Sequence, residues 1–233
     1  RGVDGVLLIP ARESCAAGAG AALREDVERV TCPVVLIDRL TQCGWCDAVG
    51  FDNYLGGRLA AQYLLEGGHK RIGIVTGDVA ESSAADRRRG FVDAIEQAGE
   101  RFDPALCVSG DYRFDGGYHA ADRIIDGGAT AVFCCNDVMA LGFRQRMAER
   151  GLHVTEDMQV IGYDNILKRF GLGLRMTTVE QSVVDLAAAG WGMLGSRIDA
   201  VVRGDGDSGA GRPWLASPQV KVLTPKLVQA ACA

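Results

Sequence analysis

The sequence lacks long apolar runs and any excess of positive charge, and each absence excludes a class of protein. No stretch of about 18 hydrophobic residues, the length needed to cross a bilayer as a helix, occurs in the 233 residues. Lys and Arg number 25 against 30 Asp and Glu, which gives a formal net charge of −5. Binding a phosphate backbone requires clustered cations, and the one basic cluster, at 87–89, falls within a helical pattern. We therefore expect neither a membrane protein nor a nucleic-acid-binding surface in this stretch.

Catalytic signatures are also missing. Histidine occurs only three times, and none of His69, His119 and His153 accompanies a nucleophilic Ser or Cys in an elbow motif. The sequence contains no Gly-x-Ser-x-Gly, no Walker A loop and no His-Glu-x-x-His, and the glycines at 18–20 do not complete a dinucleotide fingerprint. We therefore expect no enzyme, no metal site and no cofactor. Catalysis by paired carboxylates stays open, although no such pair stands out.

The eight cysteines show little regular spacing. Only Cys43 and Cys46 have the spacing of a redox pair or of half a zinc site. A redox pair follows a strand and lies at a helix N-terminus, whereas this pair falls in a turn between two strand-like runs. No second pair with metal-ligand spacing follows, so we expect reduced thiols, as in cytoplasmic proteins. A role for Cys43 and Cys46 stays open.

What the sequence does contain is a regular alternation of strand-like and helix-like segments. Helical patterns typically end at glycine, as at Gly67, Gly99, Gly127 and Gly151. The predicted helices cover 55–66, 84–98, 116–126, 138–150 and 186–202. The predicted strands, short and rich in Val and Ile, cover 6–9, 34–37, 48–51, 71–76, 106–108, 130–135, 159–163, 177–179 and 220–223.

This alternation predicts an α/β fold of right-handed βαβ units, with parallel sheets flanked by helices on both faces. The Gly-rich stretch 204–211 is the one low-complexity segment, and its composition predicts a surface loop.

Polar side chains follow several predicted strands. In open parallel sheets the ligand binds beyond the carboxyl ends of the strands, so these positions are the candidate site. Carboxylates accept hydrogen bonds, guanidinium groups donate them and amides do both, a combination that suits the hydroxyl groups of a sugar. A tyrosine could add an apolar ring that stacks on a sugar face. The candidate ligand-binding residues are Asp38, Ser83, Arg87, Tyr112, Asn136, Asp164 and Gln181.

An alternative interpretation is that Asp and Asn residues after strands only cap the next helix. Asn136 and Asp137 are the strongest candidates for such a cap. Arg87 is harder to explain in this way, because it lies near the start of a predicted helix, where the helix dipole disfavours a cation.

Eight motifs, taken in order, resemble one known family over nearly the whole chain. Together they resemble the effector-binding domain of LacI/GalR transcription regulators. The motifs are VDGVLLIP at 3–10, VLIDR at 35–39, FDNYLGG at 51–57, GGHKRIG at 67–73, RRRGF at 87–91, AVFCCNDVMA at 131–140, VIGYDN at 160–165 and TTVEQ at 177–181.

The resemblance implies a fold with two similar α/β lobes, like that of periplasmic sugar-binding proteins, and an effector in the cleft between them. Its effector contacts match the seven candidate residues, and it implies a small-molecule effector, carbohydrate in class, and a cytoplasmic homodimer or tetramer. We expect an N-terminal lobe at 1–51 and 181–218 and a C-terminal lobe at 52–180 and 219–233. The chain starts at what resembles the third strand of the first lobe, so we expect that lobe to be incomplete. Operator DNA would be bound only through a helix-turn-helix segment that this sequence does not contain.

Two other functions stay open at this point. An exported sugar-binding protein of a transporter would share the fold but would need a leader, which we do not expect from the start of this sequence. An enzyme on the same scaffold is not excluded by fold alone. The sequence also departs from the family at Arg175-Met176, where Pro often precedes the Thr pair, and at Ser182-Val183, so the effector's identity stays open.

Overall fold

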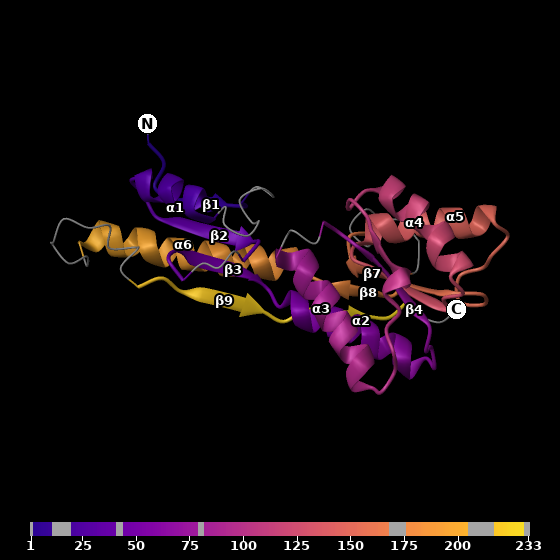
Figure 1. Cartoon of the computed structure of the whole chain (residues 1–233). Coiled ribbons are helices and arrows are strands. Elements are labelled where there is room, and N and C mark those ends of the chain that lie inside the picture. The colour runs from indigo at the N-terminus through magenta and orange to yellow at the C-terminus, as the bar shows by residue number, and fades with distance from the viewer. Residues whose placement is uncertain are drawn as a thin grey trace. The chain divides into compact units, whose positions relative to one another are not determined.

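The computed structural model describes residues 2–10, 20–40, 44–78, 82–167, 176–204 and 217–230. Cys43, Arg175 and nearly all of the Gly-rich stretch lie outside the described residues. The chain divides into two compact units (Figure 1). Unit 1 comprises 1–52, 80–82 and 182–224, and unit 2 comprises 53–79, 83–181 and 225–233.

Unit 1 is a parallel sheet with a helix on each face. Its strand order is β1 (Val6–Leu8), β2 (Val34–Asp38), β3 (Asp47–Phe51) and β9 (Val220–Leu223). Alternate residues of a strand point to opposite faces, and β2 uses both. Leu36 packs with Leu23 of α1 (Gly20–Arg29), and Val35 packs with Leu194 of α6 (Val183–Arg203).

A buried ion pair joins the first and last segments of unit 1. Asp47 is 1% exposed, and both of its carboxylate oxygens accept from Arg197 of α6, at 2.6 and 2.8 Å. The backbone N–H of Gln219 also donates to Asp47, at 2.7 Å, just before β9 begins. These bonds hold β9 beside β3. Residues 219–224 therefore lie in unit 1, which differs from the expected lobe boundary at 219.

Unit 2 has a six-stranded sheet in the order β10-β8-β7-β6-β4-β5. All its strands are parallel except β10, which runs antiparallel to β8. The strands are β4 (Ile72–Thr76), β5 (Cys107–Ser109), β6 (Ala131–Cys134), β7 (Gln159–Asp164), β8 (Thr178–Glu180) and β10 (Lys226–Val228). The helices are α2 (Asn53–Glu66), α3 (Ser82–Gln97), α4 (Phe114–Asp126) and α5 (Asp137–Glu149), and a short 3-10 turn, η2 (Pro104–Leu106), precedes β5.

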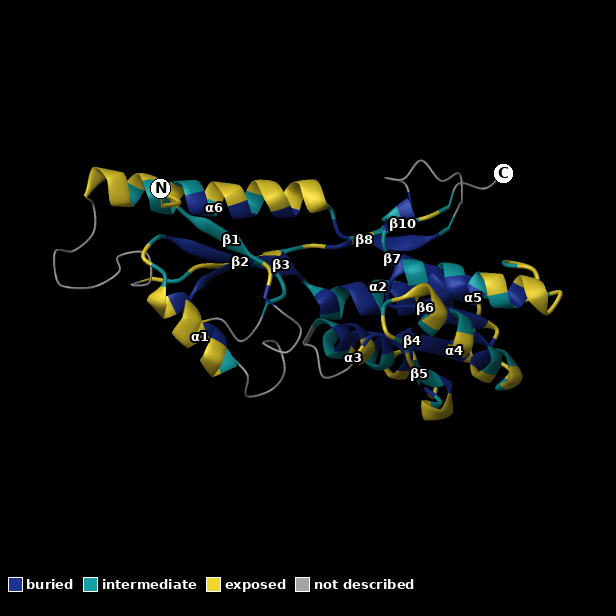
Figure 2. Cartoon of the chain, turned by 90° about the horizontal axis from the view of Figure 1, so that it is seen from above, coloured by how far each residue is buried: buried dark blue, intermediate teal, exposed yellow. Residues whose placement is uncertain are grey.

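The core of unit 2 is aromatic and aliphatic, and its central strands are buried along their length (Figure 2). Phe91 of α3 packs on Phe133 of β6, with ring centroids 5.4 Å apart, and Phe133 packs in turn against Tyr163 of β7. Tyr163 is the last residue before the acidic end of β7, so this core fixes where that strand ends.

The parallel α/β fold class predicted from the alternation is confirmed. Each predicted strand and helix is present, with ends that shift by up to three residues. Helix α1 and strand β10 were not predicted. No helix among the described residues is long and apolar enough to span a membrane.

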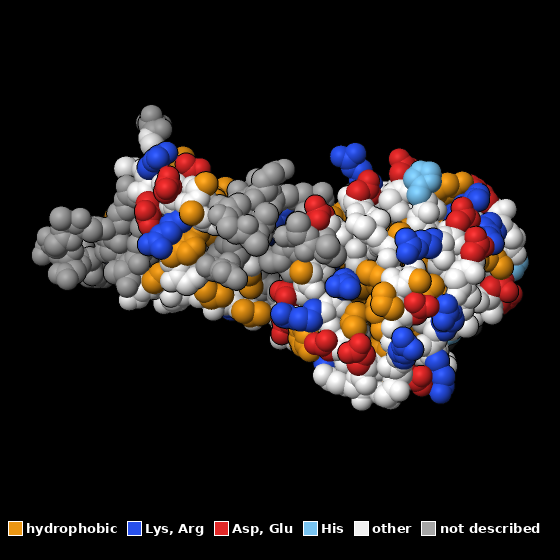
Figure 3. All heavy atoms as spheres, in the orientation of Figure 1, with side chains coloured by type: hydrophobic (Ala, Val, Ile, Leu, Met, Phe, Trp, Pro, Cys, Tyr) orange, Lys and Arg blue, Asp and Glu red, His pale blue; other side chains and the backbone are white. Residues whose placement is uncertain are grey.

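The charged surface of unit 2 is mixed rather than basic, as the face in Figure 3 shows. Arg146 of α5 and Arg150, which directly follows α5, pair with Asp122 of α4 at 3.0 and 3.1 Å, and Arg150 also pairs with Asp126 at 2.7 Å. Both of these cations therefore face acids.

Candidate functional site

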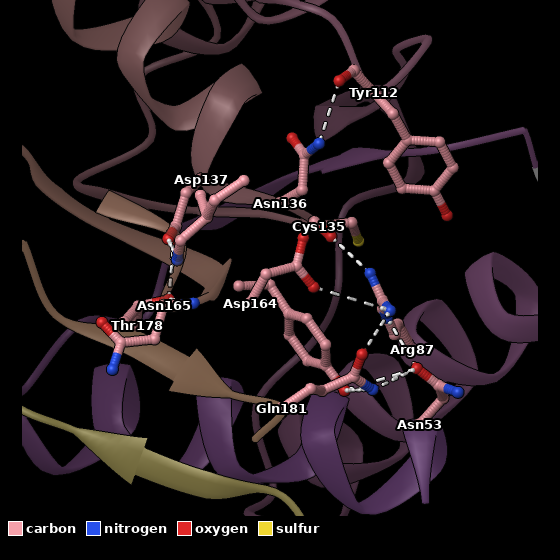
Figure 4. A network of polar contacts seen from close by, with 12 residues as sticks. Asn53, Arg87, Tyr112, Cys135, Asn136, Asp137, Asp164, Asn165, Thr178 and Gln181 are labelled. Carbon is pink, nitrogen blue, oxygen red and sulfur yellow. Dashed lines mark hydrogen bonds and ion pairs between the residues drawn. The ribbon is translucent and has the colours of Figure 1, made fainter. Parts of the chain in front are cut away.

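The centre of the candidate site in unit 2 is the guanidinium group of Arg87, which α3 places above the carboxyl ends of the sheet (Figure 4). Arg87 is 7% exposed. Its Nε donates to Asn53 Oδ1 at 2.8 Å, and its Nη1 donates to the carbonyl oxygen of Cys135 at 2.6 Å. The guanidinium also stacks on the ring of Tyr163, 3.8 Å from the ring centroid. Two short hydrogen bonds and a cation–π contact thus fix its plane.

The remaining end of the guanidinium is held only loosely. Nη2 lies 3.4 Å from Gln181 Oε1 and 4.0 Å from Asp164 Oδ1, both longer than the charge-assisted bonds on the other side of the group. The Asp164 side chain is 37% exposed, compared with 9% for the Arg87 side chain. A buried cation therefore meets a more exposed carboxylate at this point.

Arg87 remains charged in this environment. Burial alone lowers its pKa, but the neighbouring Tyr163 and Asp164 raise it, and the net shift is upward. Burial also raises the pKa of Tyr163 to about 12, so its hydroxyl is neutral and can donate. The site therefore holds one fixed cation, one carboxylate and neutral polar groups.

The polar groups that contact Arg87 are also hydrogen-bonded to one another. Gln181 Nε2 donates to Asn53 Oδ1 and to the Tyr163 hydroxyl, both at 3.2 Å, and that hydroxyl lies 3.4 Å from Asn53 Oδ1. Asn53 begins α2 and is 8% exposed, as is Gln181. Because these groups are buried and bonded to one another, they fix the orientation of Arg87.

Asn136 caps α5, as the alternative interpretation predicted. Its Oδ1 accepts from the backbone N–H of Met139 at 2.8 Å. Its Nδ2 donates to the carbonyl oxygen of Tyr112 at 2.9 Å. Tyr112 has a left-handed φ of 63°, and its ring lies so close to Gly77 that a Cβ at Gly77 would overlap it. Asn136 thus both begins a helix and fixes the loop that carries Tyr112.

The structure brings together most of the residues selected from strand ends. Arg87, Asp164 and Gln181 are in mutual proximity, and Tyr112 and Asn136 are joined to them through the end of β6. Ser83 lies one helical turn before Arg87 in α3. Asp38 ends β2, which belongs to unit 1, and has a left-handed φ of 73°.

Two supporting residues were missed from the sequence. Asn53 follows the strand at 48–51 after a single residue, so the rule that selected Asp38 could also have selected it. Tyr163 lies inside an apolar strand, and nothing in the sequence separates it from an ordinary core aromatic. Its contact with Arg87 comes only from tertiary structure.

The polar groups of this site can form hydrogen bonds with hydroxyl groups. A hydroxyl group beside the gap between Nη2 of Arg87 and Oδ1 of Asp164 can accept from the guanidinium through its oxygen and donate its hydrogen to the carboxylate. The thiols near the site are unreactive, because burial raises the pKa of Cys135 to about 12 and that of Cys134 well above its ordinary value. Among the described residues, no group of three or more His, Cys, Asp or Glu side chains is placed to hold a metal ion.

Comparison with known proteins assigns the family. A model of the periplasmic binding protein-like domain matches residues 61–221. The HTH-type transcriptional repressor PurR of Pasteurella multocida is 36% identical over 199 residues, which are 84% of this chain and 58% of that protein. The chain thus spans about half the length of the curated relatives that it matches.

Solved structures show the same fold. A LacI-family regulator from Enterococcus faecalis V583 with bound ribose has a TM-score of 0.80 at 26% identity, covering 99% of this chain and 77% of that one. The complex of the transcriptional regulator CelR with cellobiose has a TM-score of 0.79 at 28% identity, covering 98% and 65%. These relatives are regulators, which supports the regulatory function over a transporter's binding protein or an enzyme. The chain belongs to the periplasmic binding protein-like domain family, in the form found as the effector-binding domain of LacI-type transcription regulators.

Proposed function

We propose that this chain senses a small polyhydroxylated effector, of the carbohydrate class, and that Arg87 and Asp164 bind its hydroxyl groups. One observation carries the proposal. The guanidinium of Arg87 is anchored at Nε and Nη1 by bonds of 2.8 and 2.6 Å, whereas the contacts of Nη2 with the described residues are longer, at 3.4 and 4.0 Å. A fixed donor next to a half-exposed carboxylate is the pairing that vicinal hydroxyls satisfy.

The seven candidate residues, Asp38, Ser83, Arg87, Tyr112, Asn136, Asp164 and Gln181, are part of the proposal as effector contacts or supports. Asn136 already uses its carbonyl for the helix cap and one amide hydrogen for Tyr112, so it has one amide hydrogen left for an effector. The ribose and cellobiose bound by the two solved regulators support a carbohydrate effector.

The proposal extends to the whole protein. Effector binding would shift this domain between two conformations with different affinities for the effector, and that shift would control binding of operator DNA by a segment outside this sequence. We also propose a cytoplasmic homodimer or tetramer that associates through exposed sheet-flanking surfaces. On α6 such a surface includes Val184, Trp191 and Val202, which are 74%, 66% and 80% exposed.

Calorimetric titration of the full protein tests the effector class. The panel is D-ribose, cellobiose and adenosine, each titrated into the wild-type chain and into Arg87→Ala. We expect at least one sugar to bind the wild type and to lose most of its affinity in the variant. Binding of adenosine without either sugar would replace the carbohydrate class with nucleosides. No binding by any member of the panel would overturn the proposal.

A further inference from the structure

The turn after β7 has an unusual backbone. Asp164 has a φ of 94° and Asn165 a φ of 53°, so two consecutive non-glycine residues occupy the left-handed region. Residues with a Cβ seldom adopt this backbone, because it brings the Cβ close to the following carbonyl oxygen. This turn carries the carboxylate of Asp164, which faces Arg87. The contacts that hold the turn therefore also determine the position of that carboxylate.

The support comes from the buried carboxylate of Asp137, the first residue of α5. Asp137 is 1% exposed. Its Oδ2 accepts from the backbone N–H of Ile166 at 2.7 Å, and its Oδ1 accepts from the hydroxyl of Thr178 at 2.7 Å. Burial raises the pKa of Asp137, while bonds from Thr178 and from the backbone N–H groups of Ile166, Leu167 and Tyr163 lower it. One carboxylate thus interacts with backbone on both sides of the left-handed pair.

The hydroxyl of Thr178 extends this support to the middle of the turn. While donating to Asp137, Thr178 Oγ1 accepts from the backbone N–H of Asn165 at 3.3 Å. The side chain of Asn165 donates to Glu180 of β8 at 2.9 Å. In the view of Figure 4, these contacts lie on one side of Asp164 and Arg87 lies on the other.

Gly162 makes this approach possible. A Cβ at this position of β7 would overlap Oδ1 of Asp137, so the carboxylate lies directly against the strand's backbone. The side chain of Asp137 therefore fits between the start of α5 and the end of β7, where no larger side chain at position 162 would leave room.

We propose that Asp137 is a positioning residue for the effector site, whose carboxylate holds the left-handed turn so that Asp164 faces Arg87. This inference rests on the proposed function, in which Asp164 binds the effector. Asp137 itself is buried beneath the turn and acts through Asp164. Without this carboxylate, the backbone N–H of Ile166 and the hydroxyl of Thr178 lose the acceptor that they share.

The first test needs no effector. Asp137→Ala in the full protein should speed hydrogen exchange of the Ile166 amide by about tenfold or more, because that amide loses its acceptor. Asp47→Ala is the matched control, since it removes a carboxylate that is also 1% exposed but lies in unit 1. The control should leave the Ile166 amide unchanged. If Asp137→Ala does not fold, Thr178→Val tests the same support through faster exchange of the Asn165 amide. Unchanged exchange in the folded variants would overturn the inference.

The second test separates positioning from general stability. D-ribose affinity is measured for Asp137→Ala, for Asp164→Ala and for the double variant. If Asp137 acts through Asp164, the substitution should lower affinity about tenfold in the wild-type background and less than about twofold once Asp164 is Ala. An equal loss in both backgrounds would show a merely structural effect and overturn the inference. If D-ribose does not bind the wild-type chain, the proposal of ribose as effector falls, and the exchange measurement alone decides the role of Asp137.

Discussion

The carbonyl oxygen of Arg87 lies against the α carbon of Gly57, so close that a Cβ at position 57 would overlap it. The contact is reciprocal, since a Cβ on Gly90 of α3 would overlap the carbonyl oxygen of Tyr54 in α2. Two glycines thus let the backbones of α2 and α3 touch. This close crossing sets the position of Arg87 relative to Asn53, the residue that begins α2 and bonds its Nε.

Gly57→Ala should therefore damage both stability and binding. The added methyl group has no space, so the helices must separate, at a cost of about 1–3 kcal/mol in the free energy of unfolding. Arg87 moves with α3, and sugar affinity should fall. Chemical denaturation and calorimetry measure the two effects.

The control for this prediction is Gly192→Ala in α6, where an added Cβ meets nothing within 4 Å. That change should be neutral or stabilise by up to about 1 kcal/mol, because alanine favours a helix over glycine. Equal behaviour of the two variants would contradict the close-packing argument.

Arg87→Ala should weaken effector binding by about 1.5–3 kcal/mol, the value of a lost charge-assisted hydrogen bond. Arg87→Lys should restore little of this loss, because an ammonium cannot bond Asn53, Cys135 and an effector with the fork geometry of a guanidinium. Calorimetry on variants with unchanged circular dichroism measures both. Unchanged affinity in a folded Arg87→Ala would remove Arg87 from the site.

Arg197→Ala should destabilise unit 1 strongly. It leaves the carboxylate of Asp47, 1% exposed, without its bidentate partner, and breaking a buried pair in this way costs about 3–5 kcal/mol. Arg24→Ala is the comparison, because the Arg24–Glu28 pair is 56% and 46% exposed and contributes less than about 0.5 kcal/mol. Urea denaturation of both variants gives the difference, and similar midpoints would contradict the prediction.

The ion pairs between α4 and α5 should make stability fall in acid. Hydrogen bonds from Arg146 lower the pKa of Asp122 below its ordinary value of 3.8, outweighing partial burial. Because the folded-state pKa is lower than the unfolded one, the stabilisation is present above about pH 3.8 and is lost as the pH falls through the folded-state pKa.

The measurement is the slope of unfolding free energy against pH in this acid range, at low salt, since these charges are largely exposed. Asp122→Asn should reduce that slope, and Asp126→Asn serves as the comparison at a more exposed acid on the same helix, with a side chain that is 65% exposed. Identical slopes for wild type and Asp122→Asn would refute the role of this carboxylate.

Most of the fold and part of the candidate site could be predicted from the sequence, because the patterns that indicate them are local. Alternating apolar runs and Gly stops predict the strands and helices, and the rule that ligands bind beyond strand carboxyl ends selects Arg87, Asp164 and Gln181. Helix α1 was not predicted, because its mean hydropathy is low and only its residues Leu23 and Val27 are buried. The three-residue β10 depends on pairing with β8, which no local pattern reveals.

Tertiary structure decided the rest. In the sequence, Tyr163 resembles an ordinary core aromatic, and only the fold shows that its ring stacks on the guanidinium of Arg87. Asp137 likewise resembles an acid at the start of a helix, and only the fold shows that its carboxylate bonds the turn that carries Asp164. Both roles depend on residues tens of positions apart, whose proximity is set by sheet order and helix crossing rather than by spacing along the chain. Sequence periodicity determines which face of an element is buried, but only packing determines which polar groups meet there.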